Sequence, residues 1–213
     1  RMLAQAQTGT PGHVNSTAAA VPLMLEDIPL DQLEEGDHLI TNDPWLASGH
    51  LHDITISSPV FRAGQLIGFF ACTCHQLDIG GRGQGPDAAS VFEEGLAIPV
   101  LKLMKKGEIN HDLMKMIRAN VRTPGEVEAD ILSYVSANEA SAETLCNALD
   151  KLDLADLEEI GDEIIARSRA SMLQEIRKLP RGKASNTITL DSFGMPVEII
   201  CTLEVTDDGL VLD

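Results

Sequence analysis

Two four-residue elements, His50-x-x-Asp53 and His75-x-x-Asp78, carry the residue types in this chain that are best suited to chemistry. Imidazole and carboxylate are ligands that divalent Zn, Mn or Fe accepts. Side chains alternate along a regular strand, so a His and an Asp three residues apart converge only at a strand end or on a turn. The repeated element therefore predicts one divalent metal site at a place where strands end.

A purely structural interpretation competes with this one, because a His–Asp pair in a loop often serves only to cap or close a turn. The repetition of the element beside two apolar β-type runs favours the metal. His52 adds a further metal-type spacing, His50-x-His52, on one strand face. The His-x-His-x-Asp-His pattern of metallo-β-lactamases is absent, since Asp53 follows His52 directly.

A β-hairpin is predicted to position the two elements. The apolar runs 54–61 and 66–74 are separated by the four residues Arg-Ala-Gly-Gln, and a short break that contains glycine is typical of a hairpin turn. Antiparallel pairing brings the start of the first strand beside the end of the second. We therefore expect Asp53 and His75 to lie side by side.

The remaining patterns predict an α+β fold. A short helix is expected at residues 15–25, kinked or ended by Pro22, and a strand at residues 38–40. Two long helical stripes follow in the second half, the first beginning after Thr123-Pro124. We interpret this pair as a long antiparallel αα-hairpin. Strands return at residues 185–190 and 196–205 and again at the end.

Three regions follow from these patterns. Residues 1–125 are expected to form an α+β region whose antiparallel β-hairpins carry the metal site, and residues 126–180 the long helical hairpin. Residues 181–213 are expected to form β-strands that continue into a missing C-terminal part. The sequence begins as if within a domain and stops within a strand, which predicts a fragment of a larger chain.

The composition argues against some classes of binding partner. The net charge of −17 argues against nucleic acid or an anionic membrane, because both would repel the chain. No apolar run reaches the length of a membrane span. The four cysteines follow no secreted disulfide framework, which predicts a reducing, cytoplasmic compartment. The glycine-rich stretch at 80–85 lacks the spacing of a P-loop, so the sequence predicts no Walker-type nucleotide site.

Several motifs in a fixed order resemble those of the hydantoinase B family. They are GDHLITNDPW at 36–45, GHLHDIT at 49–55, HQLDIGG at 75–81, PDA at 86–88, FEEG at 92–95 and ANVRTP at 119–124. The family groups the B subunits of ATP-dependent N-methylhydantoinases, the corresponding half of 5-oxoprolinase and the α subunits of acetone carboxylase. The likeness covers nearly the whole chain.

The resemblance implies a metal-dependent half-enzyme. It places the metal ligands at His50, Asp53 and His75, in agreement with the pairing expected from the hairpin. Asp78 matches a family position beside the site, as a further ligand or a neighbour of one. Three other residues match positions near the site: His13, Asn42 and Asp43. His52 stands where the family commonly has proline, and Gln76 where a second histidine is common, so His52 is a candidate extra ligand.

The implied reaction opens a cyclic amide such as a hydantoin, 5-oxoproline or another lactam. An A-type partner subunit or domain binds ATP and Mg and phosphorylates the carbonyl oxygen, which makes that oxygen a good leaving group. The B-type part then acts with a divalent Mn, Zn or Fe, which lowers the pKa of water from about 15.7 to about 7. Asp78 or Glu93 is expected to take the proton as general base. The expected protein is a hydrolase within a hetero-oligomer.

Two other functions stay open. The same scaffold serves carboxylases that join an activated ketone to bicarbonate, as the α subunit of an acetone-type carboxylase does. Bicarbonate-dependent ATP turnover with a ketone would distinguish that reaction. A non-catalytic assembly subunit, whose acidic helical hairpin docks a partner, would bind no stoichiometric metal.

Overall fold

The computed structural model describes residues 1–6, 10–83, 85, 87–192 and 194–213. The chain forms two compact units, Arg1–Leu157 and Glu158–Asp213. The first unit contains both His-x-x-Asp elements, so the fold around the site is the fold of this unit. Its helices and strands confirm the α+β class expected from the sequence.

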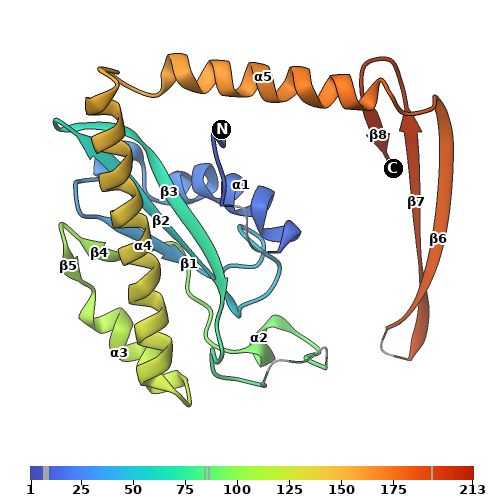
Figure 1. The fold of residues 1–213 in the computed structure, drawn as a ribbon. Coiled ribbons are helices and arrows are strands. Elements are labelled where there is room, and N and C mark those ends of the chain that lie inside the picture. The colour runs from blue at the N-terminus through green and yellow to red at the C-terminus, as the bar shows by residue number, and fades with distance from the viewer. Residues whose placement is uncertain (7–9, 84, 86, 193) are drawn as a thin grey trace. The chain divides into compact units, whose positions relative to one another are not determined.

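A five-stranded antiparallel sheet forms the centre of the first unit (Figure 1). Its spatial order is β3-β2-β1-β4-β5. The strands are β1 (His38–Thr41), β2 (Asp53–Arg62), β3 (Gln65–His75), β4 (Leu101–Lys105) and β5 (Glu108–Ile109). The last two strands had no counterpart in the sequence-based expectation.

The hairpin of β2 and β3 confirms the expected pairing. Its turn lies at Ala63 and Gly64, whose φ angles of 50° and 77° give the twist that suits a two-residue hairpin loop. At the far end of the hairpin Asp53 is the register partner of His75. The two residues therefore project from the same face of the sheet.

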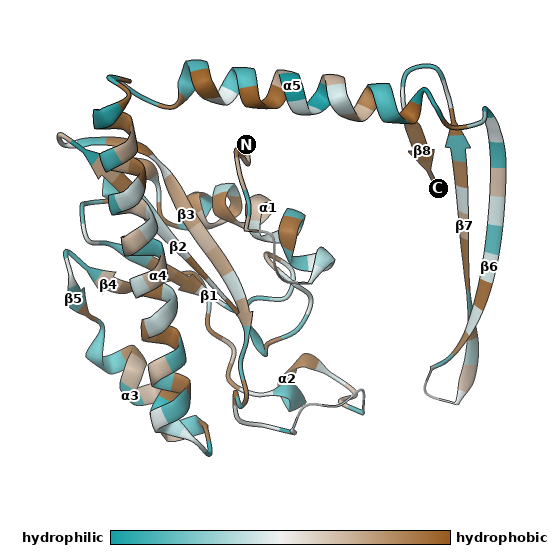
Figure 2. Cartoon of the chain, viewed as in Figure 1, coloured by the Kyte–Doolittle hydropathy of each residue, from teal (hydrophilic) through white to brown (hydrophobic). Residues whose placement is uncertain are grey.

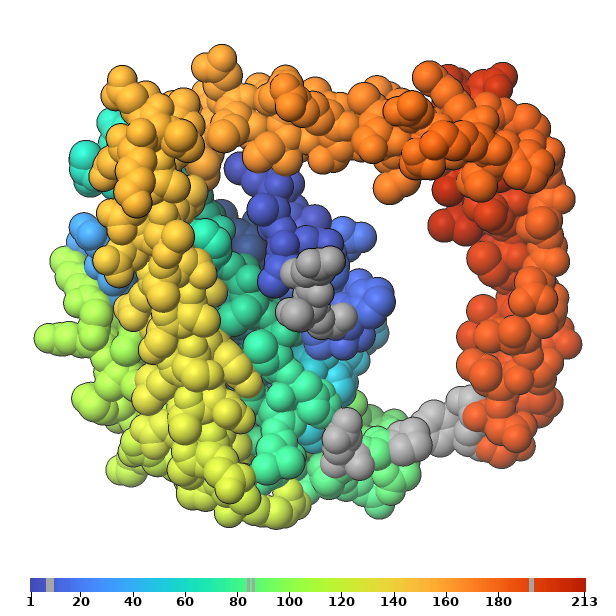
Figure 3. All heavy atoms as spheres, viewed as in Figure 1, coloured from blue at the N-terminus to red at the C-terminus, as the bar shows by residue number. Residues whose placement is uncertain are grey.

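Two helices cover opposite faces of this hairpin. On one face α1 (Pro11–Asp27) contacts β3, where the hydroxyls of Thr17 and Thr73 lie 2.6 Å apart. On the other face α4 (Pro124–Lys151) packs on β2 and β3, and the Asn138 amide donates to the Ser58 hydroxyl at 3.0 Å. Figure 3 shows β3 between these two helices. Asp53 and His75 belong to the face that α1 covers, because side chains alternate along each strand.

The core follows the same division, and the apolar residues concentrate along the strands (Figure 2). Between the sheet and α4 lies a large cluster that includes Ile54, Ile56, Ile131 and Val135, each at most 3% exposed. A smaller cluster joins Met24 of α1 to the sheet. Burial of each such side chain contributes about 1.5–3 kcal/mol.

A kink or an end of the helix was expected at Pro22, and α1 excludes the second of these. It does not end at Pro22 but continues to Asp27. Proline removes one backbone hydrogen bond from a helix, yet Ala20 and Met24 on either side of it are fully buried. Packing of these two side chains holds the last turns in place. The remaining helices of the first unit are η1 (Leu30–Gln32), α2 (Val91–Glu94) and α3 (His111–Asn120).

The second unit consists of α5 (Glu158–Ile176) and a three-stranded antiparallel sheet in the order β6-β7-β8. Its strands are β6 (Gly182–Ser192), β7 (Met195–Val205) and β8 (Leu210–Leu212). The two expected long helices are thus α4 and α5, but they belong to different units, and their antiparallel pairing stays a prediction. Within the described residues, none of the helices has the length and apolar character needed to cross a membrane.

Candidate metal centre

A single buried carboxylate, that of Asp53, is the centre of the site. It is 1% exposed and lies where β2 begins. Its Oδ1 is 2.9 Å from Nδ1 of His75, the residue that faces it across the hairpin. Its Oδ2 is 2.7 Å from Nε2 of His50. The structure therefore brings together the three residues that the sequence predicted as ligands, and the atoms that they could offer to a metal all lie within 4.8 Å of one another.

A tight turn explains how His50 and Asp53 converge although they are three residues apart. Gly49 precedes the turn with a φ of 94°, a conformation that suits glycine. The N–H of Asp53 then donates to the C=O of His50 at 3.3 Å. This hydrogen bond folds the chain back as β2 starts, so both side chains point to one place.

Two further groups reach the same carboxylate. Nε2 of His13, from the first turns of α1, lies 2.8 Å from Oδ2 of Asp53. The hydroxyl of Ser48 donates to the same oxygen at 2.7 Å. His13 was expected near the site, whereas Ser48 was not singled out by the sequence. A small hydroxyl residue in a glycine-containing turn gives no distinct sequence signal.

The electrostatics keep Asp53 ionised. Burial alone would raise its pKa, but the hydrogen bonds from Ser48 and His75 and the charges of His50 and His13 outweigh burial and lower it. The carboxylate is therefore an acceptor for several donors at once. Such a group provides a strong ligand for a cation.

His52 lines the site without touching Asp53. Its ring stacks on that of His75 at a centroid distance of 5.3 Å and an angle of 10°. The side chain is 5% exposed, and burial, followed by the neighbouring rings of His75 and His50, lowers its pKa. The neutral form of His52 is favoured, and its ring packs against one face of the His75 ring.

The donor set fits a divalent metal. Two imidazole nitrogens and one carboxylate oxygen are the ligand types that Zn, Mn and Fe take, at about 2.0–2.2 Å for zinc. Around a tetrahedral ion at that distance, two ligand atoms lie about 3.4 Å apart, which is within the 4.8 Å that contains these atoms. Among the described residues, no other group of three His, Cys, Asp or Glu side chains meets the same spacing.

The second element ends differently from the first, because Asp78 is engaged by its own neighbours. Its Oδ1 accepts from the N–H of Gly80 at 2.9 Å and from the guanidinium of Arg122 at 2.8 Å. Its Oδ2 accepts from the N–H of Arg122. Burial would raise the pKa of Asp78, but these backbone hydrogen bonds and the Arg122 charge lower it.

The two neighbouring glutamates of α2 point to different partners. Glu93 is paired with Arg82, Oε2 to Nε at 3.4 Å, and is 41% exposed. Glu94 instead accepts the N–H of Leu51, inside the turn between His50 and Asp53, at 2.8 Å. The sequence-based hypothesis named Glu93, and the structure places Glu94 beside the histidines. Glu93 and Glu94 are the same residue type at neighbouring positions, so the sequence does not indicate which of them faces the histidines.

Asn42 and Asp43 support the loops around the site. The Asn42 amide donates to the C=O of Leu51 at 2.8 Å and to that of Leu96 at 2.9 Å. Its Oδ1 accepts the N–H of Ile98 at 2.6 Å. Asp43 accepts the N–H of Trp45 at 2.9 Å and so shapes the next turn.

Glycines allow close contact between the loop after β3 and the end of α2. A Cβ at Gly81 would meet the C=O oxygen of Glu93 at 2.5 Å and the carbonyl carbon of Glu94 at 2.6 Å. Gly81 has a φ of 54°, and Gly95 has a φ of 148° against Ile79. Residues with a Cβ would force the two segments apart and move Glu94 with them.

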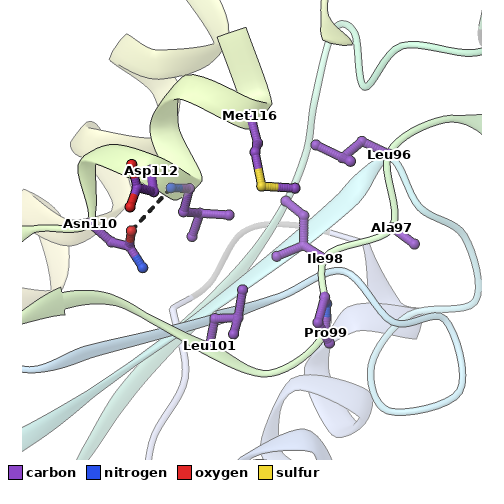
Figure 4. Close-up of a pocket in the computed structure, with 9 residues that line it drawn as sticks. Leu96, Ala97, Ile98, Pro99, Leu101, Asn110, Asp112 and Met116 are labelled. Atoms are coloured by element: carbon purple, nitrogen blue, oxygen red, sulfur yellow. Dashed lines mark hydrogen bonds between the residues drawn. The ribbon is translucent and has the colours of Figure 1, made fainter. Parts of the chain in front are cut away.

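Two hollows of the described surface lie beside the same segment. One pocket of about 190 Å³ is lined mainly by apolar side chains between residues 96–101 and α3, including Ile98, Leu113 and Met116 (Figure 4). A second, of about 420 Å³, is lined by α2 and by Gly81, Leu96 and Asn120. Neither has His50, Asp53 or His75 in its lining.

Comparison with solved structures defines the class of fold. The chain matches the crystal structure of ATP-dependent caprolactamase from Pseudomonas jessenii with a TM-score of 0.86 and 27% identity, over 95% of this chain and 36% of that chain. It matches a nucleotide-free structure of acetone carboxylase with a TM-score of 0.81 and 20% identity, over 97% of this chain and 30% of that chain. The second likeness concerns the fold alone.

The whole chain, residues 1–213, matches the model of the Hydantoinase B/oxoprolinase family, and it belongs to that family. It is 30% identical over 167 residues to the caprolactamase subunit beta of Pseudomonas jessenii, which covers 77% of this chain and 29% of that protein. The chain thus spans about a third of the length of these relatives.

Proposed function

We propose that this chain is the metal-binding part of an ATP-dependent enzyme that hydrolyses a cyclic amide. The observation that carries the proposal is the convergence of His50 and His75 on the buried carboxylate of Asp53. The family to which the chain belongs and its likeness to a caprolactamase supply the substrate class. The substrate would be a lactam, a hydantoin or 5-oxoproline, activated by an A-type partner that binds ATP.

His50, Asp53 and His75 would hold one divalent ion. When bound, such an ion supplies a Lewis acid that polarises a carbonyl or phosphoryl oxygen. Asp53 provides the negative charge of the site, and Ser48 and His13 hold its carboxylate by contacts of 2.7 and 2.8 Å to Oδ2. His52 fixes the ring of His75 by stacking.

Proton transfer is assigned to Asp78 or Glu93 in this proposal, as the sequence suggested. Asp78 is close to the site in sequence but is hydrogen-bonded to Arg122 and Gly80. Glu93 is the more accessible of the two. The variants Asp78→Asn and Glu93→Gln keep the size of each side chain but cannot take up the proton. Only the variant at the general base should therefore lose activity.

Elemental analysis of the purified chain tests the metal centre first. We expect about one Mn, Zn or Fe per chain, and loss of that metal in a His50→Ala, His75→Ala double variant. A wild-type chain without stoichiometric metal after supplementation with each ion would contradict the proposal. That result would favour a non-catalytic assembly subunit.

Activity with an A-type partner then tests the reaction. ATP turnover that depends on caprolactam, 5-oxoproline or a hydantoin, with release of the ring-opened product, supports a cyclic amidase. ATP turnover that depends on a ketone together with bicarbonate supports a carboxylase instead, the reaction named by the acetone carboxylase that shares the fold. The two outcomes use the same protein preparation.

A further inference from the structure

The backbone of Leu51, between His50 and His52, is held by side chains from distant parts of the chain. Its N–H donates to Oε2 of Glu94 at 2.8 Å. Its C=O accepts from Nδ2 of Asn42 at 2.8 Å. Its side chain is 1% exposed and belongs to the main core. The residue in the middle of the metal-binding turn is therefore fixed at three points.

Asn42 connects this turn to the segment after α2. It is fully buried, and its amide donates to Leu51 and Leu96 while its Oδ1 accepts from Ile98. Every donor and acceptor of the side chain thus has a backbone partner. Asn42 cannot move without breaking contacts on both segments.

Glu94 reaches the same turn from α2. The residue that follows it, Gly95, packs so closely on Ile79 that a Cβ would clash with the Ile79 backbone. The N–H of Leu96 also donates to the C=O of Ile79 at 2.8 Å. The backbone next to Glu94 is therefore fixed to the chain just beyond β3. The Glu94 carboxylate, held in this position, accepts the N–H of Leu51.

We propose that Asn42 and Glu94 are positioning residues of the metal centre, which fix the backbone of Leu51 and thereby direct His50 and Asp53 toward one ion. The inference rests on the proposed function, since it presupposes that these ligands bind a metal. Neither residue belongs to the group of converging ligands. Both act through a backbone that links two of the site's histidines.

The physical basis is preorganisation. A ligand held in the geometry of the bound state loses little conformational freedom when the ion arrives. A hydrogen bond from a backbone N–H to a carboxylate is stronger than one to a neutral acceptor. Loss of partners that orient the ligands of a metal typically weakens its binding by about 10- to 100-fold. The same loss is expected here when the contact to Leu51 is removed.

The test measures the dissociation constants of Mn²⁺ and Zn²⁺ by chelator competition, with the whole chain. Glu94→Leu is expected to weaken binding about 10- to 100-fold. Glu94→Asp should do the same, because its shorter side chain withdraws the carboxylate from Leu51. Glu94→Gln keeps an acceptor oxygen in place and should retain most of the affinity. Glu143→Leu, at an exposed glutamate of α4, should bind as the wild type does.

Two controls separate positioning from general damage. Thermal unfolding of the metal-free forms identifies any variant that has lost its fold, and Glu94→Asp serves if Glu94→Leu does not fold. The visible absorption spectrum of bound Co²⁺ reports the ligand geometry directly and should change in Glu94→Asp but not in Glu143→Leu.

The proposal is overturned if folded Glu94→Leu and Glu94→Asp bind both ions as tightly as the wild type. It is equally overturned if Glu94→Gln loses as much affinity as Glu94→Leu, because the acceptor is still present. A wild-type chain that binds neither ion contradicts the metal centre itself, which distinguishes failure of the proposed function from failure of the positioning role.

Discussion

Asp53 and His75 face each other across an antiparallel strand pair, with Oδ1 of the first 2.9 Å from Nδ1 of the second. Opposite residues of such a pair have Cα atoms about 4.5–5.5 Å apart and share a face. The hairpin alone therefore joins two of the proposed ligands. The position of the third, His50, depends on a turn. Substitutions that move the turn should therefore displace His50 and leave the pair of Asp53 and His75 in place.

Replacement of Asp53 by Asn should abolish tight metal binding. The variant keeps the size of the side chain but removes the negative charge. We expect the affinity for the metal to fall by at least about 100-fold, the largest loss typical of a residue that only orients a ligand. Isothermal titration with Mn²⁺ and Zn²⁺ measures the effect. Retention of wild-type affinity in Asp53→Asn would remove this carboxylate from the ligand set.

Close packing at Gly81 should connect the loop after β3 to the metal centre. Gly81→Ala combines a left-handed φ of 54° with a Cβ only 2.5 Å from the Glu93 carbonyl oxygen. Gly64→Ala is the matched control, because its φ of 77° carries the same kind of strain while no heavy atom lies within 4 Å of its Cβ.

The control should lose about 1–2 kcal/mol of unfolding free energy from the backbone conformation alone. Gly81→Ala should lose more and should also weaken metal binding, since Glu94 moves with its helix. Urea unfolding and chelator competition give the two values. Equal losses of unfolding free energy in Gly81→Ala and Gly64→Ala would contradict this prediction, because the loop would then accommodate the added Cβ by moving.

Asp78 should contribute to stability through Arg122 and Gly80. Removal of its carboxylate in Asp78→Ala breaks hydrogen bonds to a charged group, which are worth about 1.5–3 kcal/mol each in favourable cases. We expect the lower part of this range, because Arg122 is 62% exposed. Urea unfolding measures the loss.

The alternative role of Asp78 gives a different result. A general base that loses its acceptor lowers kcat by about 10²–10⁴-fold. Asp78→Asn in the complex with an A-type partner, assayed against Glu93→Gln, shows which of the two carboxylates takes the proton. Unchanged kcat in both variants would assign proton transfer to neither.

Asp37 should make the stability of the fold pH-dependent. Its side chain is fully buried and accepts from Lys102 Nζ at 2.5 Å and from the N–H groups of Lys106 and Glu34. Burial would raise its pKa, but these hydrogen bonds and the Lys102 charge lower it. Because the pKa of Asp37 is lower in the folded state, its ionised form stabilises the fold at pH values above the unfolded-state pKa of about 3.9.

That stabilisation should be lost as the pH falls through the folded-state pKa. Asp37→Asn should therefore be less stable than the wild type at pH 7 by about 1.5–3 kcal/mol, and the difference should shrink in acid. Urea unfolding of both proteins along a falling pH series measures it. A difference that stays constant in acid would show that the charge of Asp37 is irrelevant.

The hairpin and the convergence of His50, Asp53 and His75 could be predicted from the sequence because their signals are local. The apolar runs of β2 and β3 flank a turn that contains Gly64, and antiparallel pairing then fixes the partners at the open end. The long helices were visible for the same reason, since Val127, Ile131 and Val135 recur at helical spacing and are buried.

Other features depend on contacts between distant residues. The strand β5 has two residues and β4 has five, too short for a periodic pattern. Met24 keeps α1 helical beyond Pro22 through a cluster with Leu39, which the local sequence does not reveal. Glu94 finds the N–H of Leu51, 43 residues away, and only the rotation between successive helical residues separates it from Glu93.

The hairpin turn and the site lie at opposite ends of the same two strands, with an irregularity of register between Val60 and Phe61. A shift of one residue in pairing sends every side chain of a strand to the opposite face. One residue inserted at Gly64 would turn His75 toward α4 if it shifted the pairing of β3, and would leave it in place if the loop or the irregularity absorbed it. A single insertion at this distant turn, with and without repair of the Val60–Phe61 irregularity, therefore tests whether strand register is what keeps His75 opposite Asp53.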